Sequence, residues 1–81
     1  MKIRITEIDS KSIRSLEWVG LPEEGFGFGT LTIEFHSGKE YDYLDVPFGD
    51  IEKMIGSESF GFYLNNSIKP FYECREVTPI F

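Results

Sequence analysis

Apolar and polar residues alternate most regularly within residues 29–47. From Leu31 to Phe35 every second side chain is apolar, the period that is typical of a half-buried β-strand. Ser37-Gly38 has the composition of a tight turn, and a second alternating run occupies residues 39–46. We therefore predict a β-hairpin at the centre of a small sheet.

The length of the hairpin turn decides where Tyr41 and Tyr43 point. A two-residue turn at Ser37-Gly38 pairs Leu31 with Leu44 and directs both tyrosines away from the core, where a nucleobase could stack on them. A three-residue loop pairs Leu31 with Tyr43 instead, so that the tyrosines join the core. The sequence leaves both registers open.

The N-terminal part of the chain predicts extended structure followed by a loop. Residues 1–10 alternate weakly and predict an extended lead-in, and residues 12–19 predict a strand with Leu16 and Trp18 on one face. Residues 20–29 contain a proline and several glycines, a composition that predicts a loop.

The C-terminal part predicts two short helices and a strand. Residues 51–55 carry apolar side chains at i, i+3 and i+4, which indicates a helix that ends at Gly56. A second short helix is expected between a Ser57 cap and Asn65. Residues 71–77 are expected to return to the sheet as a strand.

These elements predict an α+β fold made of one domain, residues 1–81. We expect a small antiparallel sheet of three to four strands with two short helices packed on one side, in the order β-β-β-α-α-β. Thirteen aromatic side chains, eight Phe, four Tyr and one Trp, are enough to build a core without disulfides.

Charge narrows the classes of partner. Fourteen acidic and eight basic residues give a net charge of −6, and the basic residues are scattered singly. Nucleic-acid backbones are bound mainly by neutralising phosphates with Lys and Arg, so the balance argues against an extended RNA or DNA groove. It leaves room for a pocket that holds one or two nucleotides, or for a basic protein partner.

Several segments, taken in order, resemble the KTSC domain, a small bacterial and phage module that stands alone or follows some lysyl-tRNA synthetases. The resemblance runs from about residue 8 to residue 77. Because the KTSC domain follows some lysyl-tRNA synthetases in the same chain, the resemblance implies RNA binding. The matching residues are Ile8-Asp9-Ser10-Lys11-Ser12-Ile13, Leu31-Thr32-Ile33-Glu34-Phe35, Ser37-Gly38, Tyr41-Asp42-Tyr43, Val46-Pro47, Ser57-Glu58-Ser59-Phe60-Gly61, Asn65, Ile68 and Tyr72.

The first functional hypothesis is a non-catalytic module that binds RNA or a small nucleotide. Aromatic faces would stack on bases, and backbone N–H groups at a helix start near Ser59 would contact polar groups. The simpler reading of that helix start is capping by a serine oxygen. The candidate ligand-binding residues are Tyr41, Tyr43, Ser59, Asn65 and Tyr72.

The second hypothesis is an acidic interaction protein of the kind that phages use to inhibit a basic or nucleic-acid-binding partner. Exposed aromatic residues on the predicted 20–29 loop would favour an interface, or a homodimer, unless their rings cover the core instead. The candidate contact residues are Glu23, Glu24, Phe26 and Phe28.

Catalysis, metal binding and membrane insertion find little support in the sequence. His36 has no nucleophilic partner at a recognisable spacing, and Cys74 is the single cysteine, so neither a disulfide nor a Cys-based zinc site is expected within the chain. Asp45 is expected on the opposite face of the strand from Glu40 and Asp42, so the three carboxylates would not gather around one metal ion. We expect no enzyme, cofactor or metal, and a cytoplasmic protein without membrane contact.

Overall fold

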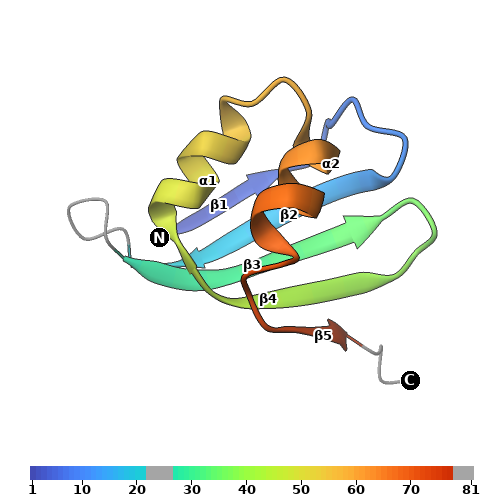
Figure 1. Ribbon diagram of the computed structural model, residues 1–81. Helices are drawn as coiled ribbons and strands as arrows, with labels where there is room; N and C mark the ends of the chain where they lie inside the picture. Colours follow the sequence, from blue (N-terminus) through green and yellow to red (C-terminus); the bar gives the residue numbers. More distant parts are fainter. Residues whose placement is uncertain (22–26, 78–81) are drawn as a thin grey trace.

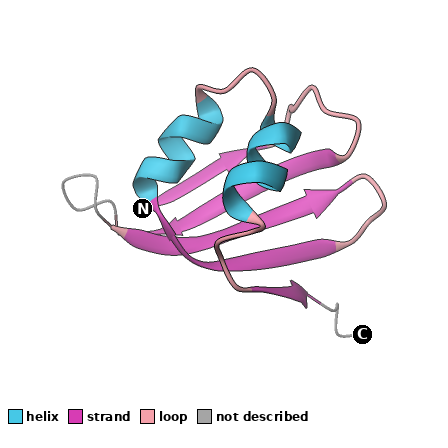
Figure 2. Ribbon diagram, viewed as in Figure 1, coloured by secondary structure: helices cyan, strands magenta, loops and turns pink. Residues whose placement is uncertain are grey.

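The computed structural model describes residues 1–21 and 27–77, which form a small α+β fold with an antiparallel sheet and helices on one of its sides (Figure 1). Four strands come first, the helical segments follow, and a last short strand ends the described chain (Figure 2). The elements are β1 (Lys2–Ile5), β2 (Ile13–Gly20), β3 (Phe28–Phe35), β4 (Glu40–Pro47), α1 (Phe48–Ile55), α2 (Phe60–Tyr63), η2 (Leu64–Ile68, a π-helix) and β5 (Cys74–Val77).

The sheet has five strands in the spatial order β1-β2-β3-β4-β5, and each pairs antiparallel with its neighbours. The expected three to four strands were too few, and the order is β-β-β-β-α-α-β. The difference arises at Lys2–Ile5, expected only as a lead-in, because Lys2 and Ile5 pair with Val19 and Leu16 of β2.

The predicted loop at residues 20–29 is shorter than expected. β2 continues through Gly20, β3 begins at Phe28, and Gly20 faces Gly29 across the two strands. A Cβ atom on Gly29 would lie 2.4 Å from the Val19 carbonyl oxygen and 2.7 Å from Cε2 of Trp18. These glycines therefore make room for the Trp18 ring inside a strand pair.

The central hairpin has the three-residue loop, His36 to Gly38. Gly38 donates to the Phe35 carbonyl oxygen over 2.9 Å and has a φ of 93°, the left-handed conformation that glycine adopts without a steric penalty. Leu31 consequently faces Tyr43, and Ile33 faces Tyr41. The alternative two-residue register is wrong.

A bulge in β4 changes which residues reach the core. The β3–β4 register shifts between Gly29 and Leu31, so β4 has one extra residue there, and Asp45 has a φ of 55°. Simple alternation would place Val46 on the opposite face from Tyr43. The bulge returns it to the core, where it is 0% exposed.

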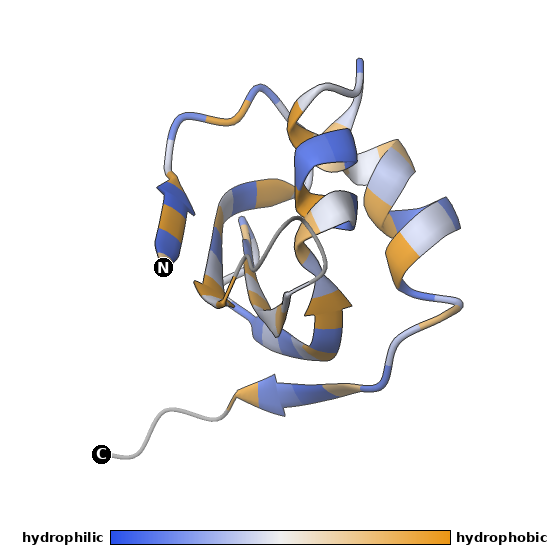
Figure 3. Ribbon diagram, turned by 90° about the vertical axis from the view of Figure 1, so that its left-hand side faces the viewer, coloured by the Kyte–Doolittle hydropathy of each residue, from blue (hydrophilic) through white to orange (hydrophobic). Residues whose placement is uncertain are grey.

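The core lies between the sheet and the helices, and Figure 3 shows the helices on one side of the sheet, turned by 90° from the view of Figure 1. Trp18 occupies its centre: Nε1 donates to the Val46 carbonyl oxygen over 3.0 Å, and its ring centroid lies 5.4 Å from that of Phe48. The buried hydrophobic residues of the described chain are Ile13, Leu16, Trp18, Leu31, Ile33, Tyr43, Val46, Ile51, Met54, Leu64 and Ile68.

Both helical predictions hold in part. α1 buries Ile51 and Met54 and ends at Gly56, but Ile55 is 44% exposed. The second helix is capped by Ser59, not by Ser57, whose hydroxyl donates to the Met54 carbonyl oxygen over 2.6 Å. It continues past Asn65 as η2, in which Leu64 and Ile68 are buried.

Candidate functional site

The two central tyrosines are part of the core rather than a stacking platform. Tyr43 is 2% exposed, and burial raises its pKa to about 12, with smaller contributions from Cys74 and Tyr41. Tyr41 is half-buried and packs edge-on against Phe35, with 5.8 Å between the ring centroids. Their faces are thus not free for a base.

Ser59 acts as a helix cap. Its side-chain oxygen accepts a hydrogen bond from the Phe62 backbone N–H over 3.1 Å, which satisfies one of the free donors of the first helical turn. Asn65 is exposed. A shallow hollow of about 630 Å³ lies next to this helix start and is lined by Ser57, Glu58, Ser59, Phe62 and Tyr63.

Tyr72 belongs to a polar cluster that joins three parts of the chain. Its hydroxyl and that of Tyr63 both donate to Asp50, the Tyr63 bond over 2.8 Å. Burial first, and the hydrogen bond to Asp50 second, raise the pKa of each phenol to about 12. The cluster connects α1 to α2 and to the segment before β5, so the Tyr72 hydroxyl takes part in a hydrogen bond that holds the fold together.

The residues assigned to a protein contact are only partly described. Glu23, Glu24 and Phe26 lie outside the described residues. Phe28 lies in β3 rather than on a loop and is 62% exposed. Because Phe28 is an odd number of residues from the buried Leu31, it faces the side of the sheet that the helices leave uncovered.

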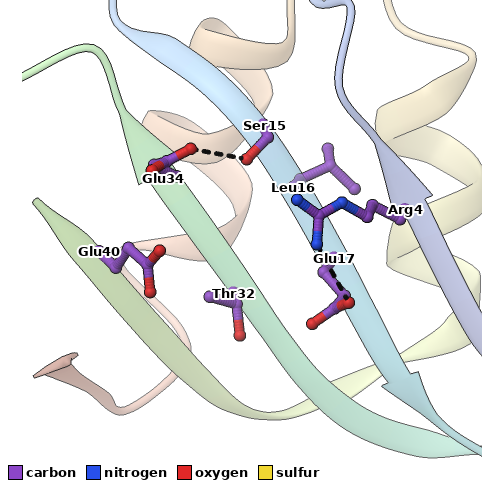
Figure 4. Close-up of a pocket in the computed structure, with 7 residues that line it drawn as sticks. All are labelled: Arg4, Ser15, Leu16, Glu17, Thr32, Glu34 and Glu40. Atoms are coloured by element: carbon purple, nitrogen blue, oxygen red, sulfur yellow. Dashed lines mark hydrogen bonds and ion pairs between the residues drawn. The ribbon is translucent and has the colours of Figure 1, made fainter. Parts of the chain in front are cut away.

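This uncovered face, the side of the sheet opposite the helices, carries a group of carboxylates on its middle strands (Figure 4). Ser15 donates to Glu34 over 3.2 Å, and Thr32 donates to Asp42 over 2.6 Å. A notch of about 150 Å³ opens between these strands and is lined by Arg4, Ser15, Leu16, Glu17, Thr32, Glu34 and Glu40.

The ion pairs on this face converge on one acid. Lys2 Nζ lies 3.1 Å and Arg4 Nη1 3.9 Å from the same Oε1 atom of Glu17. Glu34 and Glu40 take part in no ion pair with another described residue. The bases of this face sit on the edge strands, whereas the carboxylates occupy the middle.

The residues considered for catalysis or metal binding are dispersed. His36 is exposed, and its Nε2 lies 3.0 Å from the Ser10 carbonyl oxygen. Cys74 is exposed in β5. Within residues 1–21 and 27–77, no three His, Cys, Asp or Glu side chains gather where they could hold a metal ion.

Comparison with known proteins identifies the family. The family model of the KTSC domain matches residues 28–72, from the start of β3 to Tyr72. The chain belongs to the KTSC domain family. The matched segment contains the hairpin and the helices that cover it, whereas β1 and β2 precede it.

A solved structure of a KTSC domain protein has a similar fold. The crystal structure of a KTSC domain protein from Yersinia pestis superposes with a TM-score of 0.77 and 24% sequence identity, covering 96% of this chain and 100% of the other. A comparison with curated proteins gives no match. Among the helices of the described chain, none is long and apolar enough to cross a membrane.

Sequence reasoning did not identify the acidic group on the uncovered face, although a signal for it was present. Glu17 alternates with the core residues Leu16 and Trp18, and Glu34 alternates with Ile33 and Phe35. With the three-residue hairpin loop, the same alternation places the acids of β4 beside them. The hairpin register therefore determines whether the acids of β4 lie beside those of β2 and β3.

Proposed function

We propose that this chain is a non-catalytic binding module of the KTSC type, and that it binds a basic protein partner on the uncovered face of its sheet. The observation that carries the proposal is the group of carboxylates on the middle strands of that face, Glu17, Glu34, Glu40 and Asp42. A cytoplasmic setting belongs to the same proposal, supported by the single free cysteine.

The charge distribution favours a cationic partner. Both bases of β1 are directed at Glu17 alone, which leaves Glu34 and Glu40 beside the notch for a partner's Lys or Arg. Arg75 is the basic residue on the other edge, opposite Asp42. Complementary charge increases the association rate and selects among partners, and the net charge of −6 acts in the same direction.

RNA or a small nucleotide, the first expectation from the sequence, is the alternative class of ligand. The geometry supports it less, because Tyr41 and Tyr43 pack in the core and Tyr72 bonds Asp50. Carboxylates on the uncovered face also repel phosphates. A nucleotide would have to use the hollow beside Ser59, where Phe62 is 69% exposed.

An amide-resolved NMR titration distinguishes the two classes of ligand. A hexalysine peptide and a short mixed RNA would each be added at low and at physiological salt. We expect hexalysine to shift amides of β2, β3 and β4 on the uncovered face, with affinity falling as salt screens the charges. Shifts caused by RNA around Ser59 and Asn65 would replace the protein proposal with the nucleic-acid one.

Matched charge reversals localise the effect. The pair Glu34→Lys and Glu40→Lys and the pair Glu7→Lys and Glu52→Lys both change the net charge from −6 to −2. Glu7 and Glu52 are exposed, the former before β2 and the latter on α1. We expect the first pair to weaken hexalysine binding about tenfold and the second pair much less. Equal weakening would mean attraction by net charge alone.

A further inference from the structure

The uncovered face also carries exposed apolar side chains at one end, where β2 ends and β3 begins. The apolar corner consists of Val19 and Phe28 on this face and Leu21 directly after the end of β2, which are 49%, 62% and 64% exposed. Val19 alternates with the buried Trp18, and Phe28 faces the same side by its spacing from Leu31. Large apolar groups gathered on one surface are typical of interaction sites.

The apolar corner and the carboxylates lie in line along β3. Alternation places Phe28, Thr32 and Glu34 on the uncovered face, and a strand advances about 3.3 Å per residue. Thr32, which bonds Asp42 over 2.6 Å, therefore lies about 13 Å from Phe28 along the strand. Glu34 lies about 20 Å from Phe28.

We infer that the partner presents an extended segment that lies along β3, with an apolar residue on the apolar corner and Lys or Arg four and six residues away. Side chains of an extended segment face the same side at even spacings, and its rise per residue matches that of β3. The basic side chains would then face Asp42 and Glu34. This inference rests on the proposed function and specifies its partner.

Charge selects this occupant over a second copy of the chain. A partner copy would bring another net charge of −6 against the carboxylates, which disfavours their close approach. A basic segment neutralises the same groups while its apolar residue covers the exposed side chains of the apolar corner. A partner segment with an aromatic or aliphatic residue at one end and basic residues at the other would match both the apolar corner and the carboxylates.

Two heptapeptides of identical composition test the spacing. LSTSKSK places Lys at i+4 and i+6 from Leu, and LSTKSKS moves them to i+3 and i+5, where they project to the opposite side. Dissociation constants would be measured by NMR on the whole chain at low salt. We expect LSTSKSK to bind about tenfold more tightly, because it alone engages both ends of the face.

Two serine substitutions of exposed phenylalanines test the apolar corner. Phe28→Ser removes the one aromatic ring of the apolar corner, and the control Phe62→Ser removes a ring that is 69% exposed on α2. We expect Phe28→Ser to weaken LSTSKSK binding about tenfold and Phe62→Ser to leave it unchanged. Unchanged amide spectra away from each substitution would show that both variants fold.

The outcomes separate this inference from the proposed function. Equal binding of both heptapeptides with no effect of Phe28→Ser overturns the inference, while hexalysine binding that responds to Glu34 and Glu40 preserves the proposed function. Failure of every basic peptide to bind overturns both. Sedimentation that shows a dimer dispersed by Phe28→Ser would also overturn the inference, because a second copy would then cover the apolar corner.

Discussion

At the scale of the residue, two glycines shape the core. Gly20 and Gly29 face each other beneath the Trp18 ring, where added Cβ atoms would lie 2.8 Å and 2.7 Å from indole carbons. Trp18 could be predicted as a core residue from its alternation with polar neighbours. The glycine composition instead indicated a loop, because a sequence does not show that glycine serves a neighbouring ring rather than a turn.

Replacing Gly29 with alanine should destabilise the fold. The new Cβ would meet the Val19 carbonyl oxygen at 2.4 Å, so strand or ring must shift, and overpacking of this kind costs about 1–3 kcal/mol. Gly56→Ala is the control: its Cβ would lie 3.5 Å from the Glu52 carbonyl oxygen, an ordinary van der Waals contact, and the φ of Gly56 is −81°. Urea unfolding should show a lower free energy of unfolding for Gly29→Ala and an equal or higher one for Gly56→Ala.

The phenols bound to Asp50 should make stability fall at high pH. The pKa values of Tyr63 and Tyr72 are about 12 in the fold, against an ordinary value of 10. The unfolded chain therefore loses these protons first, and the contribution of these two phenols to the free energy of unfolding is constant below pH 10 and is lost between pH 10 and 12. Phenolate absorbance and urea unfolding across this range would measure both effects.

Asp50→Asn provides the matched control for that titration. It removes the carboxylate charge and weakens the acceptor, so we expect the two phenols to ionise at lower pH and the fall in stability above pH 10 to become smaller. Phenol titrations that are identical in the two proteins would show that Asp50 does not hold these protons.

At the scale of the element, the sequence located the hairpin and both helices, but it did not define their ends. The hairpin followed from alternation, whereas its register depended on whether His36 belongs to the turn, which alternation does not decide. Asn65-Asn66 has the composition of a helix stop, yet burial of Leu64 and Ile68 continues the helix through it. Tertiary packing overrides local propensity at this position.

Ser59→Ala should destabilise α2 through loss of its cap. The Phe62 N–H loses its side-chain acceptor, and comparable substitutions cost about 1 kcal/mol. Thermal unfolding should show a lower Tm for Ser59→Ala and a Tm close to the original for Ser59→Asp, which retains an acceptor. An unchanged Tm combined with loss of nucleotide binding would instead assign Ser59 to a ligand.

At the scale of the whole molecule, α+β class and one-sided helices could be predicted, but the site could not. The sequence left two hairpin registers open, and the observed one, together with the β4 bulge, places Tyr43 and Val46 in the core instead of forming a tyrosine platform. The acidic group on the uncovered face required that same register. A site built across three strands is defined by how they align, and single-strand periodicity does not contain that information.

Hydrogen exchange should rank the strands by their place in the sheet. β2 and β3 are eight residues long and lie between partners, whereas β1 and β5 have four residues each and lie at the edges. We expect amides of β2 and β3 to exchange only on global unfolding and those of β5 to exchange by local opening. Equal protection of β3 and β5 would contradict this ranking.

Each strand from β2 to β5 pairs with the strand that precedes it in the chain, and among these pairings only β4–β5 spans the helices. As the chain leaves a ribosome, β1 to β4 can pair in turn before the helical residues are available. Until α1 and η2 arrive, Trp18, Leu31 and Ile33 would face water on an open sheet. The interval between completion of β4 and docking of the helices is therefore the stage at which a chaperone, or aggregation, would act on this protein.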